Sequence, residues 1–362
     1  MDHRNHRSAG RESGPDPKPP GASIKAPVLS GQRTESGSRL WRRGPGFPAW
    51  ARFLATTVVI LAMSHAFGAD DDSFRVGFSS AMFSDVNEND AKASVKAWGQ
   101  TIAQERGIPT DPDTRIFKDI PTLSQALHDK SVDAVGITVI EYAALSQTVR
   151  FAPIFVTYTG GRSREEYLVL VHRDSEIERL ADLRGRSLTF HENSRVRLAR
   201  PWLDTLLIPE TGKPASEWLA KITDVPKLSK VVLPVFFHQL DACVVTRTGF
   251  ETMAELNPQV GKQLKIIANS PEMVPGVFCF RADYAPKFKE DLFAGIRDLN
   301  KSVPGQQVLT VFQSDKIQEE PASCLDSAVE VLARFARITA SQPATNVATE
   351  LVTSPSSAGG NP

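Results

Sequence analysis

The chain has 362 residues, of which 41% are hydrophobic and 23% are charged. These ordinary values exclude a wholly disordered, collagen-like or multi-span membrane chain. The 42 basic and 42 acidic residues cancel, so the net charge gives no sign of a nucleic-acid partner. A chain of this length exceeds what one compact core usually supports, which predicts two domains or lobes.

Residues 1–52 differ from the rest of the chain. They hold ten Lys and Arg against four Asp and Glu, a net charge of +6, which leaves 32 against 38 for the other 310 residues. This leader is rich in Pro and Gly and has no apolar periodicity, so it cannot bury enough surface to offset its ordering entropy. We predict a disordered basic leader at 1–52 and, from a similar composition, a disordered tail at 341–362.

An uncharged, mostly apolar stretch begins at Phe53 and is followed by small residues and three aspartates. A basic flank, a short apolar core and a small-residue end are the parts of a secretory signal. We therefore predict a signal-peptide core and cleavage region at 53–69, and export to the periplasm. The alternative is a short membrane anchor, because 53–69 is marginal in length for a bilayer core about 30 Å thick.

The residues that usually indicate enzymes and metal sites show no characteristic spacing. Cys243, Cys279 and Cys324 form no CxxC motif, and we expect buried free thiols, with one disulfide as the alternative. The seven histidines include no HExxH or other spaced ligand set. GxSxG, P-loop and GxGxxG motifs are also absent from the sequence. We predict no catalytic residue, no metal and no cofactor.

From residue 70 the chain alternates strand-like and helix-like segments. The first cycle has predicted strands at Phe74–Phe78, Arg115–Phe117, Val132–Thr138 and Phe151–Val156. Helices are predicted between them, at 90–105, Pro121–His128 and from Glu141 to Leu145. This rhythm indicates a parallel sheet with helices on both faces.

A second cycle follows. Its predicted strands are Tyr167–His172, Ser187–Phe190, Ala242–Thr246, Leu264–Ala268 and Val277–Phe280. Its predicted helices are Leu180–Arg184, Arg195–Leu207, Gly249–Leu256, Pro286–Leu299 and Leu325–Ile338. Residues 228–237 fit either a strand or a helix interrupted by Pro234.

The doubled rhythm predicts an α/β fold of two similar lobes, each a mostly parallel sheet flanked by helices, with a ligand cleft between them. An internal echo agrees with it, because Val132-Asp133-Ala134-Val135 is similar to the stretch from Leu240 to Val244. We assign 70–160 to the first part of lobe 1, 161–265 to lobe 2 and 266–340 to the second part of lobe 1.

Ligands of open α/β sheets bind beyond the carboxyl ends of the strands, where loops lead into helix N-termini that favour anions. Candidates at such positions are Ser79, Ser80, Thr138, Ser194 and Arg195. For Ser194 a plain helix cap is an equal alternative, and for Arg195 a solvated helix face. Asp241, before a predicted strand, fits either a ligand amine or a turn.

Several segments together resemble the phosphate, phosphite and phosphonate-binding proteins of ABC importers. The resemblance covers roughly residues 75–338 and rests on RVGF, VDAVGITVIEYAAL, EEYLVLVHRDSEIERLADLRGRSLTF, HENSRVRLARPWL and LDACVV. It implies the type 2 periplasmic-binding-protein fold. Where the family has a run of Ser and Thr, this chain has Asn193-Ser194-Arg195, and Phe83 stands where an aromatic residue is expected.

The resemblance implies a monomeric periplasmic solute-binding protein that captures a small anion by hinge closure and delivers it to an ABC permease of the inner membrane. Ser79, Ser80, Thr138, Ser194 and Arg195 would bind the anionic head, and Tyr142 and Asp241 would line the cleft. Hinges are expected near 158–167 and 264–270. The alternatives are the ligand-sensing module of a membrane sensor, and an enzyme on the same two-lobed fold.

Overall fold

The computed structural model describes residues 73–83, 88–111 and 114–341. Every described residue lies in the second of the two units into which the chain divides, residues 68–362. The predicted leader, the apolar segment 53–69 and residues 342–362 of the predicted tail lie outside the described residues. Within the described part of the chain, no helix combines the length and the apolar character that a membrane span requires.

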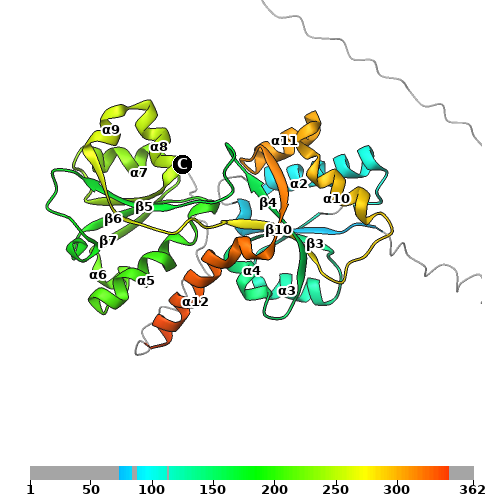
Figure 1. Cartoon of the computed structure of the whole chain (residues 1–362), viewed down its shortest axis with the longest axis horizontal. Helices are drawn as coiled ribbons and strands as arrows, with labels where there is room; N and C mark the ends of the chain where they lie inside the picture. The colour runs from blue at the N-terminus through cyan, green and yellow to red at the C-terminus, as the bar shows by residue number, and fades with distance from the viewer. Residues whose placement is uncertain (1–72, 84–87, 112–113, 342–362) are drawn as a thin grey trace, which may run out of the picture. The chain divides into compact units, whose positions relative to one another are not determined.

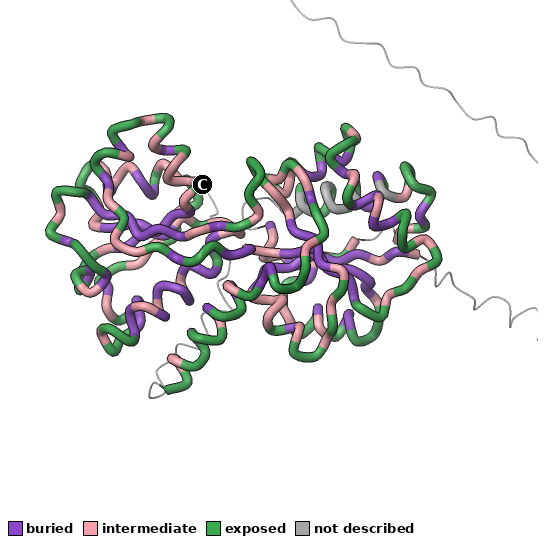
Figure 2. Tube along the Cα trace, in the orientation of Figure 1, coloured by how far each residue is buried: buried purple, intermediate pink, exposed green. Residues whose placement is uncertain are grey.

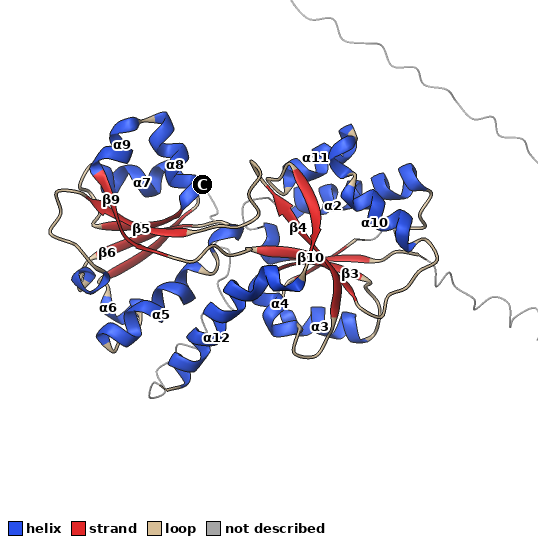
Figure 3. Cartoon of the chain, in the orientation of Figure 1, coloured by secondary structure: helices blue, strands red, loops and turns tan. Residues whose placement is uncertain are grey.

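Two β-sheets with helices packed against them form the second unit (Figures 1 and 3). The first sheet has the strand order β11-β4-β10-β3-β1-β2, and the second has the order β7-β6-β8-β5-β9. The strands of the first sheet are β1 Val76–Ser79, β2 Arg115–Phe117, β3 Ala134–Thr138, β4 Phe151–Tyr158, β10 Gly276–Arg281 and β11 Lys316–Glu320. Those of the second are β5 Tyr167–His172, β6 Ser187–His191, β7 Lys221–Val225, β8 Ala242–Thr246 and β9 Leu264–Asn269. The two-lobed α/β class is thereby confirmed.

The α-helices connect these strands in chain order. They are α2 Glu88–Arg106, α3 Ile120–His128, α4 Val139–Leu145, α5 Ala199–Thr211, α6 Ala215–Trp218, α7 Leu228–Phe236, α8 Arg247–Leu256, α9 Pro258–Gln263, α10 Lys289–Arg297, α11 Val303–Val311 and α12 Asp326–Ala340. Short 3₁₀ turns are η1 Ser80–Phe83, η2 Leu180–Leu183, η3 Ser194–Val196, η4 Leu299–Lys301 and η5 Ala322–Leu325.

Both sheets are mixed, which corrects the expectation of mostly parallel sheets. In the first sheet β1 is parallel to β2 and β3, while β10 is antiparallel to β3 and β4, and β11 to β4. In the second, β6 is parallel to β7 and β8, while β5 is antiparallel to β8 and β9. The reason is that β5 and β10 enter their sheets from the crossing between lobes. They begin where the parallel strands end, as the pairs Tyr167 with Thr246 and Gly276 with Thr138 show, so they run in the opposite direction.

The core lies in the central strands, because every residue of β3, β5 and β8 is buried (Figure 2). Strands covered on both faces read as continuous apolar runs, and this explains why the sequence made them visible. One hydrophobic cluster includes residues of both sheets, such as Val135 and Val169, together with Ala328 and Val331 of α12. Helix α12 packs against both α4 and α5. The two lobes therefore share part of their core.

Two chain segments connect the sheets, one between β4 and β5 and the other between β9 and β10. They pair at one point, where the N–H of Glu165 donates to the carbonyl of Met273 at 2.8 Å and the reverse bond measures 2.9 Å. The second crossing thus covers 270–275. The expected hinge at 264–270 is displaced, since 264–269 forms β9, and the predicted boundary at residue 265 falls inside that strand.

Several predictions about single elements are resolved by the structure. Residues 228–236 form a helix that contains Pro234. The predicted helix 195–207 is divided into η3 and α5. All three cysteines are free and buried, as expected, and burial raises the pKa of the Cys243 thiol to about 12. That pKa keeps Cys243 in the unreactive thiol form at neutral pH.

Candidate functional site

A repeated pattern, Asp-Ala followed by three residues and Thr, organises the central strand of each lobe. Asp133 precedes β3 and Asp241 precedes β8, and each strand ends in a threonine, Thr138 or Thr246. Each threonine caps the helix that follows its strand, because its Oγ1 accepts a hydrogen bond from the N–H of Glu141 (3.4 Å) or Gly249 (3.0 Å). The threonine of each central strand therefore lies at the carboxyl end of that strand, beside the segments that cross between the lobes.

The two aspartates lie at the opposite ends of these strands. Oδ2 of Asp133 accepts from the N–H of Arg75, and Oδ2 of Asp241 from the N–H of Ser187, both at 2.9 Å. Burial raises the pKa of Asp241, but its hydrogen bonds from Ser187 and the charge of Arg186 outweigh that effect and leave the pKa below its ordinary value. Both aspartates fasten a central strand to its parallel neighbour. Asp241 thus lies at the end of β8 away from Thr246, where its hydrogen bonds with Ser187 are those of a turn residue.

In the first lobe the predicted hydroxyls meet a carboxylate of the same chain. Glu141 accepts hydrogen bonds from the hydroxyl of Ser79, from the N–H of Thr138 at 2.9 Å and from the hydroxyl of Thr138 at 2.8 Å. Sequence analysis missed Glu141. Its signal was the Thr-x-x-Glu spacing, a capping box that closes the start of α4.

Ser80 and Tyr142 have different surroundings. Ser80 opens η1, and its hydroxyl has no hydrogen-bond partner among the described residues. Tyr142 lies on α4, with its ring centroid 5.7 Å from that of Phe151. Burial raises the pKa of Tyr142, with the nearby Cys279 and Cys324 adding to the shift. Tyr142 therefore acts mainly in the packing of its helix, while Ser80 offers a free hydroxyl.

In the second lobe η3 carries Ser194 and Arg195, directly after Asn193. The side chain of Asn193 caps this turn by accepting from the N–H of Arg195 at 2.9 Å. The cap alternative for Ser194 is therefore not what the structure shows, since Asn193 takes that role. The hydroxyl of Ser194 has no protein partner in the described part of the chain.

The side chain of Arg195 reaches away from its own lobe rather than forming a solvated helix face. Nη1 donates to Oε1 of Glu165 at 2.8 Å, and Nη2 donates to Oγ1 of Thr159 at 2.8 Å and to the carbonyl of Gln313 at 2.9 Å. Glu165 and Thr159 belong to the first crossing, and Gln313 follows α11 of the first lobe. Arg195 thus links the second lobe to the crossing and to the first lobe.

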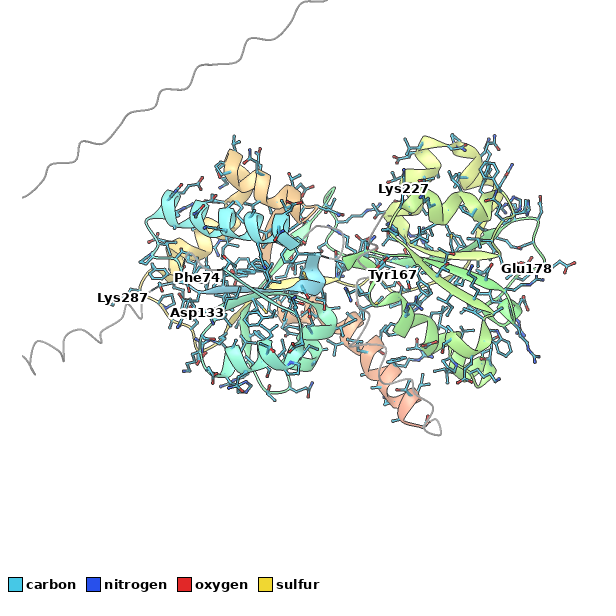
Figure 4. All side chains as sticks on the ribbon, turned by 180° about the vertical axis from the view of Figure 1, so that it is seen from behind. Phe74, Asp133, Tyr167, Glu178, Lys227 and Lys287 are labelled. Carbon is cyan, nitrogen blue, oxygen red and sulfur yellow. The ribbon has the colours of Figure 1, made fainter. Side chains whose placement is uncertain are left out.

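Two further residues that sequence analysis missed support Arg195. The buried Tyr167, labelled in Figure 4 at the start of β5, donates its hydroxyl to the carbonyl of Arg195 at 2.8 Å. Burial and the charge of Glu165 raise the pKa of Tyr167, so it remains a proton donor. Glu165 is 7% exposed at its side chain, and its Oε2 is buried and has no hydrogen-bond partner among the residues that the structure describes.

A cavity of about 50 Å³ lies beside Arg195. It is lined by residues of both lobes and of the second crossing, namely Met82, Thr157, Ser194, Arg195, Pro275, Gly276, Val311, Phe312 and Gln313. The 3₁₀ turns η1 and η3, which carry Ser80 and Ser194, also lie against each other. The guanidinium of Arg195 and the free hydroxyl of Ser194 line this cavity, and both are donors of the kind that bind an oxyanion.

Comparison with known proteins identifies the family. Residues 80–323 match the family described as ABC transporter, phosphonate, periplasmic substrate-binding protein. The chain belongs to this family. The predicted resemblance is thereby confirmed.

Solved structures agree on the fold. The XAC2383 protein of Xanthomonas citri bound to ATP is similar with a TM-score of 0.52 and 17% identity, covering 75% of this chain and 99% of that one. The phosphonate-binding protein PhnD1 of Prochlorococcus marinus (MIT 9301), in complex with methylphosphonate, gives 0.50 and 14%, covering 74% and 99%. A search of curated protein sequences finds no match.

Membership of the family establishes the kind of work that the chain does. It is a substrate-binding component of an ABC transporter, and proteins of this family are transport proteins rather than enzymes. The family is exported to the periplasm, and its members hand a small ligand to an ABC permease. The functional class expected from the sequence is therefore confirmed.

Proposed function

We propose that this phosphonate-family protein binds a small oxyanion in the cavity beside Arg195 and closes its two lobes over it. The observation that carries the proposal is the position of this guanidinium at a cavity lined from both lobes. Two of its present acceptors, the Thr159 hydroxyl and the Gln313 carbonyl, are neutral. An anion attracts a guanidinium more strongly than neutral oxygens do, so a phosphonate oxygen replaces them on Nη2.

The free hydroxyls of Ser80 and Ser194 complete the proposed head-group site, one from each lobe. Ser79 and Thr138 serve it indirectly, because their hydroxyls already donate to Glu141. A ligand that approaches Glu141 has to supply a hydrogen of its own, as a monoprotonated oxyanion or an amine does. We therefore place the charged oxygens on the side of Arg195 and a hydrogen-bond donor on the side of Glu141.

The ligands of the structural neighbours support an anion. One neighbour is bound to ATP, one is in complex with methylphosphonate, and another structure of the Xanthomonas citri protein is bound to chloride ion. All three ligands are anionic. The chain's own contribution to this chemistry is Arg195, within the stretch where the resemblance led us to expect Ser and Thr.

Thermal unfolding of the whole chain tests the proposal. Methylphosphonate, phosphate, phosphite, sulfate and small carboxylates are added one at a time. A ligand at 100 times its dissociation constant stabilises by about 2.7 kcal/mol, which raises the midpoint by about 4–5 °C in a protein of this size. We expect a shift with one class of oxyanion, and no shift with any of them contradicts the proposal.

Substitution of the guanidinium then identifies the site. In Arg195→Ala the affinity for the stabilising oxyanion falls at least tenfold by titration calorimetry, because the charge-assisted bonds are lost. Arg197→Ala is the matched control, since Arg197 is exposed, lies two residues further on and does not line the cavity. Equal affinities of the two variants would refute the role of Arg195.

The finer points of the assignment are proposals as well. We propose that the partner is an inner-membrane permease rather than a membrane sensor, that 53–69 is a cleaved signal rather than an anchor, and that the exported chain is a monomer. The family supports the first two, since its members are exported binding components of importers. Sequencing the amino terminus of the exported protein, and measuring its mass by light scattering, separate these alternatives.

A further inference from the structure

A second polar cluster lies in the second lobe, on residues that the proposed function does not use. It consists of His172, Asp174 and His238, whose potential metal-ligand atoms all lie within 4.8 Å of one another. Strand β5 begins at Tyr167, beside the crossing, and ends at His172, so the cluster lies at the end of β5 away from Arg195. Figure 4 labels Tyr167 and also Glu178, which follows the same turn and lies at the outer end of this lobe.

The fold brings these residues together although they are far apart in the sequence. His172 is the last residue of β5, and Asp174 lies in the turn that follows it. His238 comes directly after Phe237, which ends α7, and α7 packs against β5. The sequence contains no spaced ligand motif because the second histidine arrives through this packing of a helix on a strand.

The geometry aims the three side chains at one region. Nδ1 of His172 lies 3.9 Å from Oδ2 of Asp174, and it now accepts a hydrogen bond from the N–H of Asp174 at 3.1 Å, which a metal ion on that nitrogen has to replace. The ring centroids of His172 and His238 are only 3.7 Å apart. His238 has a left-handed backbone conformation, with φ of 56°, which is uncommon for a residue with a side chain.

We propose that His172, Asp174 and His238 bind a divalent transition-metal ion, with Zn²⁺ as the preferred ion. Two imidazoles and one carboxylate are ligands that suit Zn²⁺, and they are too rich in nitrogen for Mg²⁺ or Ca²⁺. The bonds needed are about 2.0–2.2 Å long, which places the donor atoms of a tetrahedral site about 3.3 Å apart. The two rings, now in contact, therefore have to turn, and donors that now lie up to 4.8 Å apart have to approach one another. Asp174, with 82% of its side chain exposed, is free to make that movement.

The surrounding charges are compatible with a cation. Arg173 turns its guanidinium away from the cluster, because its Nε donates to the carbonyl of Lys262 at 2.9 Å. The ammonium of Lys265 is paired with Glu178. The cluster itself carries the negative charge of Asp174. Three protein ligands leave a fourth position to water, so we expect an exchangeable ion that ties the end of β5 to the end of α7.

Titration calorimetry with the whole chain tests the site, with ZnCl₂ as the probe and MgCl₂ in parallel. We expect saturable binding of Zn²⁺ and none of Mg²⁺. His238→Gln and Asp174→Asn each replace an exposed ligand, so the fold is retained, and each lowers the Zn²⁺ affinity at least tenfold. His128→Gln is the control, because His128 is an exposed histidine of the first lobe that bonds the carbonyl of Ser124.

Two results overturn the proposal. One is the absence of saturable Zn²⁺ binding. The other is Zn²⁺ binding that survives both substitutions, which would place the ion elsewhere, for example on His3 and His6 of the leader. Circular dichroism of each variant without metal distinguishes a lost ligand from a lost fold. The oxyanion titration is unaffected by either result, because the two sites share no residue.

Discussion

At the scale of single residues, Asp133 and Asp241 show how much the sequence already contained. Their shared spacing was visible, and so were the two roles open to Asp241, ligand contact or turn. Both aspartates precede their strands, and ligands of such sheets bind beyond the opposite, carboxyl ends. The position before the strand therefore favoured the turn role. The contacts of Arg195, in contrast, could not be predicted from the sequence. Its hydrogen bond to Gln313 joins residues 118 positions apart, and no local pattern indicates such a contact.

The two aspartates differ in what surrounds them, and this gives a stability prediction. Asp133 is fully buried and pairs with Arg75 at 2.9 Å and with the buried Arg281 at 3.2 Å. Asp133→Asn leaves the buried Arg281 with the half-exposed Asp283 as its remaining anionic partner, at a cost of about 3 kcal/mol. Asp241 is partly exposed, and Asp241→Asn costs about 1 kcal/mol.

Urea unfolding of the two variants beside the unchanged protein measures the difference. The midpoint falls much further for Asp133→Asn than for Asp241→Asn, and neither change reaches the cavity beside Arg195. Equal losses would show that the buried arginine contributes nothing to the difference. A loss of oxyanion affinity in Asp241→Asn would return that residue to the ligand site.

At the scale of elements, the sequence revealed the buried strands and missed polar edge strands. β7, with sequence KITDV, and β11, with sequence KIQEE, were not predicted. Both lie at the edges of their sheets, where charged residues prevent an exposed strand from pairing with another chain. The same charged residues interrupt the apolar pattern by which a strand is predicted. Along α12 the apolar Val329 is 38% exposed while the neighbouring Ala328 is buried, so apolar character alone does not identify the buried face. Residues one position apart on a helix differ by 100°, so a small error of phase moves a side chain to the surface.

Gly136 in the middle of β3 is required by the packing of the first sheet. A Cβ atom there would lie 2.3 Å from the ring of Phe78, and that ring stacks on Phe278 with centroids 5.9 Å apart. The added methyl group forces the Phe78 ring out of this stacked position, so Gly136→Ala lowers the free energy of unfolding by about 1–3 kcal/mol.

Gly99, inside α2, provides the matched control. Among the described residues, the nearest atom to a Cβ at this position is the Thr110 methyl carbon at 3.4 Å, an ordinary contact. Alanine favours a helix over glycine by up to about 1 kcal/mol, so Gly99→Ala leaves the stability unchanged or raises it. Thermal melts of both variants compare them, and a stable Gly136→Ala protein would mean that the Phe78 ring has another place to pack.

At the scale of the whole molecule, the sequence predicted the two-lobed architecture because the alternation of strands and helices and the Asp-Ala pattern each occur twice. The contacts between the lobes could not be predicted from the sequence, because they join segments that are distant in the chain. The shared hydrophobic cluster, the pairing of Glu165 with Met273 and the bonds of Arg195 all belong to this class. They determine how the lobes meet, and only the folded chain reveals them.

From the shifted pKa values we predict that the free energy of unfolding is nearly constant around neutral pH and falls at both acid and alkaline pH. Hydrogen bonds and nearby cations lower the carboxyl pKa values of Asp119, Glu166, Asp182, Asp241, Asp283 and Asp298 in the folded chain. At acid pH the unfolded chain therefore binds more protons, and stability falls as the pH drops below about 5. Burial and hydrogen bonding raise the pKa values of Tyr142, Tyr158, Tyr167, Cys243, Cys279 and Cys324. Their contribution is lost as the pH rises above the ordinary values of 9 to 10.

Urea unfolding in a series of buffers from pH 3 to pH 11 measures this profile. The free energy of unfolding should stay level near neutrality and decline at both ends. Glu166→Gln, which removes the partner of Arg247, should weaken the acid decline. A profile that is flat down to pH 3 would mean that these carboxyl groups titrate alike in the folded and unfolded chain.

Helix α12 restricts how the lobes can move. The two crossings pair at Glu165 and Met273 and so provide a narrow axis, while α12 rests on α4 of one lobe and α5 of the other, as a third connection. Three attachments resist free swivelling, and an apolar helix contact yields most easily to sliding. We therefore expect the two lobes to open and close along a single path, without rotation in other directions. The two lobes would then adopt only a few relative orientations before a ligand binds. Less conformational entropy would therefore be lost on binding.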